Sequence, residues 1–130
     1  MALTITSIAA FLNGLFILAL TIKVILIRRR DGVVLGDNDD RVLTKAIRGQ
    51  ANATEQIPLA LILMGLIEVQ NGPGWLLIPL AATFTIGRLM HATYFGIHGT
   101  PWQLRFYGMF LTLIAQGGLI LALLLTLISQ

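Results

Sequence analysis

Long stretches without charged residues dominate this chain and limit what it can fold into. Only 12% of its 130 residues are Asp, Glu, Lys or Arg, while 56% are apolar. Soluble domains carry about 25% charged residues, and a chain this short would need them to cover its large relative surface. Disorder requires the opposite composition, with low hydrophobicity and high charge. The sequence therefore predicts an integral membrane protein.

The apolar stretches predict four membrane-spanning helices in a single domain, residues 1–130. A spanning helix takes about 20 residues, so four of them with short connections use nearly the whole chain. We expect helices over Met1–Ile22, from about Val42 to Gln70, from about Trp75 to Ile97, and from near Trp102 towards Gln130. Turn-forming residues at 71–74 and 98–101 separate the last three. The first helix is predicted to be retained, since no basic segment or A-x-A-like cleavage site precedes the charges.

The basic residues cluster in a way that predicts topology. They gather in or beside the first loop, at Arg28, Arg29, Arg30, Arg41, Lys45 and Arg48. Arg105 lies beside the third loop, while the second loop and both termini carry no Lys or Arg. The positive-inside rule then places loops one and three in the cytoplasm. The sequence pI of about 10.0 thus reflects topology, and no nucleic-acid partner is expected. With no cysteine and two histidines, no metal site is predicted either.

Ionisable residues within the second and third helices are the strongest functional signal. Arg48, Asn52 and Glu55 stand at i, i+4 and i+7, which places them within roughly 60° on one helix face. Arg88 and His91 lie in the third helix. Such residues are costly in a membrane, usually face the bundle interior and often mark function. The stripe and Arg88 are therefore expected to approach one another on the cytoplasmic side.

Two interpretations of this cluster remain open. In the structural one, Arg88 and Glu55 form an ion pair and Asn52 joins two helices by a hydrogen bond. In the functional one, the cluster binds a small ligand of mixed charge: guanidinium groups grip carboxylates, and Glu55 binds an ammonium group. No nucleophile–base pair is visible, so a reactive group would come with the ligand. Pro58 lacks the donor for the carbonyl of Thr54, which predicts a kink in the second helix.

Two motifs extend this reading to a known family. The segment from Arg48 to Pro58 has the pattern R-x-x-x-N-x-x-E-x-x-P, and Arg88-Leu-Met-His91 is followed by Tyr94. With Arg105 at the start of the fourth helix, the chain resembles the MAPEG family, membrane-associated proteins in eicosanoid and glutathione metabolism. It is most similar to the small bacterial members. The resemblance extends from about residue 36 to about residue 108.

The resemblance implies a fold and an activity. The family fold is an antiparallel bundle of four transmembrane helices, assembled as a homotrimer. Glutathione, the co-substrate, binds between subunits near the cytoplasmic face. The implied function is a glutathione-dependent transferase or peroxidase in a bacterial inner membrane. Its second substrate is a lipophilic electrophile or hydroperoxide that arrives from the bilayer.

The resemblance also implies roles for individual residues. Arg48, Asn52 and Glu55 would hold the charged ends of glutathione. The neighbouring subunit's side of the pocket would be lined by Arg88, His91 and Tyr94. The catalytic residue would be Arg105, since a cation near the thiol lowers its pKa and the thiolate is the nucleophile.

One position departs from the family pattern, and two other functions remain as alternatives. Many members have a tyrosine seven residues after the third-helix arginine. This chain has Phe95 there and a tyrosine at 94, about 100° away around the helix. The first alternative is a non-catalytic protein of the same fold that binds glutathione or lipid. The second, a small drug/proton antiporter, is disfavoured because the first helix has no acidic residue. None of these patterns assigns a role to Glu68.

Overall fold

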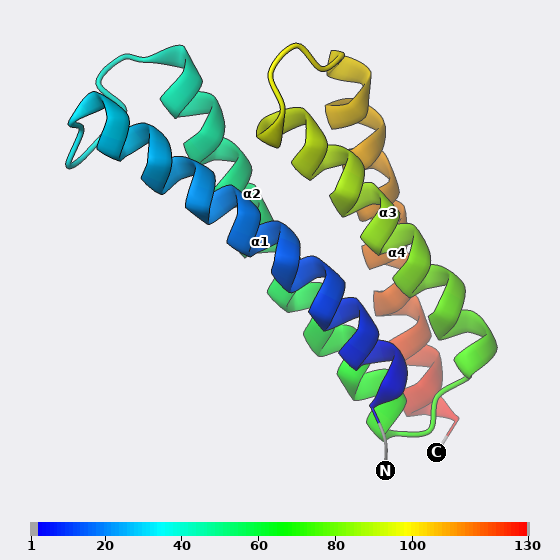
Figure 1. Cartoon of the computed structure of the whole chain (residues 1–130). Helices are drawn as coiled ribbons and strands as arrows, with labels where there is room; N and C mark the ends of the chain where they lie inside the picture. The colour runs from blue at the N-terminus through cyan, green and yellow to red at the C-terminus, as the bar shows by residue number, and fades with distance from the viewer. Residues whose placement is uncertain (1–2, 130) are drawn as a thin grey trace.

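The computed structural model describes residues 3–129 and confirms an all-α fold (Figure 1). Its helices are α1 Thr4–Asp31, α2 Arg41–Val69, α3 Gly74–Gly96 and α4 Trp102–Ile128. All four are long and apolar enough to cross a membrane. Met1 and Gln130, the outer limits expected for the first and last helices, lie outside the described residues.

The prediction for the end of the first helix was wrong by nine residues. Lys23 ends the apolar run, but α1 continues to Asp31, because Lys and Arg are good helix formers. The helix stops at Gly32, whose φ of 67° is left-handed, a conformation that glycine adopts without steric cost. The last turn of α1 therefore carries Arg28, Arg29 and Arg30, where cations also complement the helix dipole.

The helix α2 begins at a capped residue and runs unbroken through its proline. The Asp40 side chain accepts a hydrogen bond from the backbone N–H of Val42 at 2.8 Å, as N-cap residues do. Pro58 lies inside the continuous helix, and the kink there stays a prediction. Nearby, Gln116 of α4 donates to the carbonyl of Gln56 at 3.2 Å. This bond ties the middle of α2 to α4.

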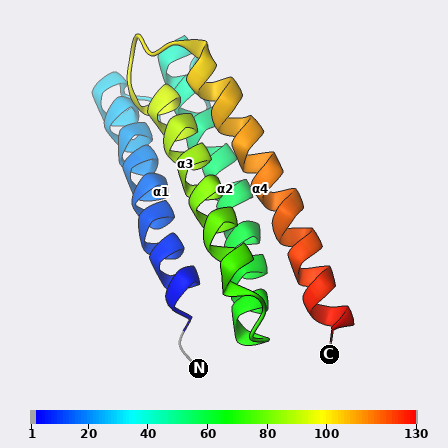
Figure 2. The same cartoon turned by 90° about the vertical axis from the view of Figure 1, so that its right-hand side faces the viewer.

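The helices run antiparallel, so that the loops 32–40 and 97–101 share one end of the molecule (Figure 1). We call this the two-loop end. Both ends of the described chain and the α2–α3 turn lie at the opposite end (Figures 1 and 2). The most extensive packing joins α3 to α4, and α1 packs on α2 and α3. Within residues 3–129, α1 and α4 do not meet. In Figure 1 the α1–α2 pair and the α3–α4 pair separate towards the two-loop end.

The core is apolar and the outer surface is apolar too. The largest fully buried apolar side chains include Phe84, Leu43, Ile57, Met64 and Leu119. Outward side chains such as Phe11 and Phe110 remain exposed along the helices. A soluble protein would cover its surface with charges, so this exposed surface fits a lipid environment.

A glycine contact sets the distance between α3 and α4. A Cβ on Gly108 would lie 2.7 Å from the backbone nitrogen of His91 and 2.8 Å from the carbonyl oxygen of Gly87. The two backbones therefore touch here, as small residues allow in membrane bundles. Arg105 lies one turn before Gly108 in α4. The crossing thus brings His91 and Arg105 to the same part of the molecule.

Two ionisable residues fasten helix ends. The carboxylate of Glu68 accepts hydrogen bonds from the backbone N–H groups of Ile5 and Thr6, both at 2.9 Å. It therefore caps the start of α1, where donors lack intrahelical partners. The amine of Lys23 donates to the carbonyls of Phe95 and Gly96 at 3.1 and 2.6 Å, and so caps the end of α3. Neither residue was assigned a role from the sequence motifs.

Candidate functional site

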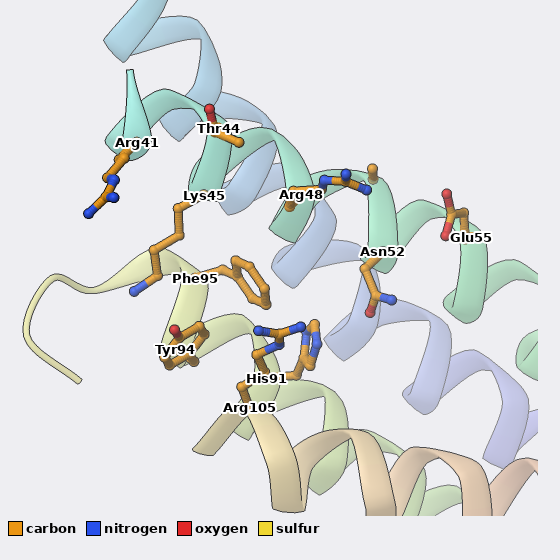
Figure 3. A pocket seen from close by; sticks show the side chains of 11 residues that line it. Arg41, Thr44, Lys45, Arg48, Asn52, Glu55, His91, Tyr94, Phe95 and Arg105 are labelled. Atoms are coloured by element: carbon orange, nitrogen blue, oxygen red, sulfur yellow. The ribbon is translucent and has the colours of Figure 1, made fainter. Parts of the chain in front are cut away.

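A polar cavity of about 740 Å³ opens at the two-loop end between α2, α3 and the start of α4 (Figure 3). Six of the seven predicted site residues line it: Arg48, Asn52, Glu55, His91, Tyr94 and Arg105. They share this cavity within a single protomer. Four other lining residues of functional interest were not predicted from the sequence: Arg41, Thr44, Lys45 and Phe95.

The polar stripe of α2 is longer than predicted. Arg41 and Lys45 precede Arg48 by seven and three residues, and both line the cavity with it. Continuing the i+3 and i+4 spacing back from Arg48 would have found them, since such residues share a helix face. In Figure 3, Lys45 and Asn52 extend from α2 towards the side chains of α3. The stripe thus forms one wall of the cavity.

Positive charge dominates the cavity. Its cationic side chains are Arg41, Lys45, Arg48 and Arg105, against the single carboxylate of Glu55. Glu55 is exposed and points away from His91 and Arg105 (Figure 3). The ion pair found among residues 3–129 is Arg30–Asp31, which does not line the cavity. The cavity is therefore suited to an anionic ligand.

Aromatic side chains form the floor near Lys45. Its Nζ lies 3.9 Å from the centroid of the Tyr94 ring, within cation–π range. Phe95 meets Tyr94 edge-on at 5.0 Å between ring centroids, and the Cζ of Arg105 lies 6.0 Å from the Phe95 ring. A Cβ on Gly49 would overlap Phe95, so the glycine makes room for this ring. Both Tyr94 and Phe95 thus line the cavity.

Arg88 lies behind the cavity wall. It is 1% exposed, and its Nη2 donates to Oδ1 of Asn52 at 2.9 Å and to Nδ1 of His91 at 3.2 Å. The alternative ion pair with Glu55 is not formed. The Nε and Nη1 atoms of Arg88 are buried and have no partner in the described chain. Arg88 therefore contacts two cavity residues and does not line the cavity itself.

A second cavity, of about 460 Å³, adjoins the first. Asn52, His91 and Arg105 line both, and we call these three residues the shared wall. The rest of the second cavity is apolar and aromatic: Trp102, Phe106, Met109, Phe110 and Leu113. A charged compartment and an apolar one thus meet at the same three side chains.

The loop between α1 and α2 is fastened next to the polar cavity. The hydroxyl of Thr44, which lines the cavity, donates to Oδ2 of Asp37 at 2.9 Å. This hydrogen bond lowers the pKa of the Asp37 carboxyl, because it stabilises the charged form.

No cluster of three His, Cys, Asp or Glu that could hold a metal ion occurs among residues 3–129.

Comparison with known proteins identifies relatives. The family model of the MAPEG family matches residues 6–125. Inner membrane protein YecN of Escherichia coli strain K12 is 32% identical over 118 residues, which cover 91% of this chain and 88% of that protein. The protein of the same name from Escherichia coli O6:H1 strain CFT073 has the same identity and coverage. No solved structure matches this chain.

Proposed function

Because the chain belongs to the MAPEG family of membrane proteins, we propose that it is a glutathione-dependent transferase or peroxidase. The observation that carries the proposal is the shared wall. A cation-rich cavity suits glutathione, and an apolar cavity suits a lipophilic second substrate. Asn52, His91 and Arg105 face both, so the two substrates would meet at these side chains.

The polar cavity fits the chemistry of glutathione. The tripeptide carries two carboxylates, one ammonium group and one thiol. The guanidinium groups of Arg41, Arg48 and Arg105 and the amine of Lys45 offer partners for carboxylates, and Glu55 offers one for the ammonium group. The volume of about 740 Å³ lies within the range of small-molecule sites, about 300–1,000 Å³.

Arg105 is the residue we assign to thiol activation. It lies on the shared wall, and a nearby cation favours the thiolate, which is the nucleophile. In the transferase reaction the sulfur forms a bond to an electrophilic carbon, the leaving group departs with its electron pair, and the thiol proton passes to water. In the peroxidase reaction two thiols become a disulfide, and the hydroperoxide becomes an alcohol and water.

We also place the protein as a homotrimer in a bacterial inner membrane, with the two-loop end towards the cytoplasm. Arg48, Glu55 and Arg105 are exposed in the single protomer, so a second copy would close the open side of the cavity. The relative from Escherichia coli is named an inner membrane protein. The exposed apolar side chains of the helices suit contact with membrane lipid.

The proposal is tested with the full chain in detergent or lipid nanodiscs. We expect saturable turnover of glutathione with a halonitrobenzene or a lipid hydroperoxide, and glutathione binding by calorimetry. Arg105→Ala should reduce turnover by about 10²-fold or more, as loss of a charge-stabilising group does. Arg29→Ala is the matched control, because Arg29 is exposed at the same end but does not line either cavity.

The outcomes separate the alternatives. The absence of both glutathione binding and turnover would exclude the proposed function. Binding without turnover for either substrate class would support a non-catalytic protein of the same fold. Equal activity of the Arg105→Ala and wild-type proteins would exclude the role assigned to Arg105.

A further inference from the structure

The buried guanidinium of Arg88 determines how two residues of the shared wall present their hydrogen-bonding atoms. Its Nη2 lies 2.9 Å from Asn52 Oδ1 and 3.2 Å from His91 Nδ1. A guanidinium has only donors, so both partner atoms must be acceptors. The two contacts therefore determine which ring nitrogen of His91 carries the proton and which way the amide of Asn52 is turned.

For His91, the contact selects one neutral tautomer. Because Nδ1 accepts from Arg88, the ring proton must lie on Nε2. Nε2 forms no hydrogen bond with any residue among 3–129, and this atom is not fully buried. His91 lines both cavities. Its free Nε2–H is thus a donor available to a ligand.

For Asn52, the contact selects one orientation of the amide. With Oδ1 directed at Arg88, the Nδ2 group and its two protons are left for the cavity. The Nδ2 atom, like the Nε2 of His91, has no hydrogen-bond partner within the described chain and is not fully buried. Arg105, the third residue of the shared wall, also has only donors. All three residues then present N–H groups at the same place.

We infer that Arg88 is a positioning residue that makes the shared wall a site for an acceptor without a proton. Under the proposed function, on which this step depends, that acceptor is the thiolate of glutathione. The sulfur of a neutral thiol is only a weak acceptor, whereas a thiolate is charged and accepts stronger hydrogen bonds from these donors. Arg88 acts through Asn52 and His91, and does not touch the ligand.

The tautomer can be measured without any ligand. The chain has two histidines, and His98 is exposed and lines neither cavity, so His98→Gln leaves a single histidine signal. Nitrogen and carbon NMR of labelled histidine in lipid bilayers then shows which ring nitrogen carries the proton. We expect it on Nε2. A proton on Nδ1, or on both nitrogens, would overturn the inference.

Removal of the Arg88 side chain tests the positioning role. Arg88→Met should distribute the proton between both ring nitrogens and weaken glutathione binding by about tenfold or more, as loss of hydrogen bonds to a charged group does. Helix content and thermal melting establish that the variant is folded. Folded Arg88→Met with the wild-type ring signal and affinity would contradict the inference.

Two substitutions at His91 test the donor itself and do not depend on Arg88→Met folding. His91→Gln places an amide near the position of Nε2, and His91→Asn places one near Nδ1. We expect the glutamine variant to retain more of the glutathione affinity and more thiolate absorbance on mixing. Equal loss in both variants, or the reverse order, would count against the donor role.

The two proposals can fail separately. If the wild-type protein binds no glutathione, the proposed function fails, while the ring-nitrogen measurement still decides how Arg88 positions His91. If glutathione binds but the proton lies on Nδ1, the function stands and the positioning role is excluded.

Discussion

At the scale of single residues, ionisable side chains within the apolar helices serve two different purposes. Glu68 and Lys23 bind backbone groups at helix ends, whereas Glu55 and Arg105 line a cavity. Their sequence signal is the same, a charge within an apolar helix. They differ in their partners. Glu68 and Lys23 form hydrogen bonds with backbone groups of neighbouring helices, whereas Glu55 and Arg105 have no hydrogen-bond partner among the described residues.

This difference predicts opposite effects for two glutamates. Glu68→Ala removes the acceptor for two N–H groups of α1 and should lower the free energy of unfolding by about 1–2 kcal/mol. It should leave glutathione affinity unchanged, because Glu68 lies thirteen residues from Glu55, about 20 Å along α2. Glu55→Ala should do the reverse. Unfolding titrated with detergent measures the free energy of unfolding, and calorimetry measures glutathione affinity. A Glu68→Ala protein that keeps its full stability but binds glutathione more weakly would contradict these separate roles.

The candidate site was predictable in part at this scale. Helical spacing identified Arg48, Asn52 and Glu55, and the same spacing extended by two turns would have included Arg41. The position of Arg88 was not predictable, because it depends on how α3 is rotated against α2. Spacing along one helix does not determine that rotation. The motif therefore reads the same whether Arg88 is buried or lines the cavity.

At the scale of helices, the crossing of α3 over α4 holds the shared wall together. Gly87 and Gly108 allow backbone contact that includes the backbone of His91, and Arg105 lies about one turn before Gly108. A larger residue at the crossing would separate the helices, because neither backbone can move aside independently. The relative position of His91 and Arg105, two of the three residues of the shared wall, is thus a property of this helix pair.

Gly108→Ala tests this dependence. Its Cβ would meet the backbone of His91 and Gly87 at under 3 Å, and such overpacking costs about 1–3 kcal/mol of stability. We also expect weaker glutathione binding, since His91 moves away from Arg105. The control is Gly117→Ala on the same helix, where a Cβ meets nothing within 4 Å of it in the protomer. Similar losses in the two variants would show that the crossing has no special role.

Helix number and most helix limits were predictable because apolar length, turn residues and charge each leave a direct pattern. The exception was the end of α1, because the charge of Lys23 ends the apolar run but not the helix. Charge ends an apolar run, but the helix itself ends at Gly32, whose left-handed backbone breaks the repeat. Glycine was the better signal.

At the scale of the whole molecule, the antiparallel order places the two basic loops at one end. The structure confirms that the loops 32–40 and 97–101 share an end and that the α2–α3 turn lies at the other (Figure 1). Which end faces the cytoplasm is a prediction from the positive-inside rule. Because the chain has no cysteine, one introduced thiol reports one position without a background.

Labelling with a membrane-impermeant maleimide tests the orientation. Val34 is 94% exposed in the first loop, and Ser129 is exposed at the opposite end. We expect Ser129→Cys to react from outside the inner membrane and Val34→Cys to react only after the membrane is opened. The opposite pattern would show that the two-loop end, with the polar cavity, faces outward.

The pair of adjoining cavities has a consequence for how concentration must be counted. Under the proposed function, the charged cavity takes its ligand from water, whereas the apolar cavity takes a substrate dissolved in the bilayer. For a substrate of the second kind, the relevant quantity is its mole fraction among the lipids, not its molarity in the sample. Added inert lipid then dilutes this substrate, whereas added buffer does not. Two assays with the same molar concentration of substrate but different lipid content therefore saturate the apolar cavity to different degrees.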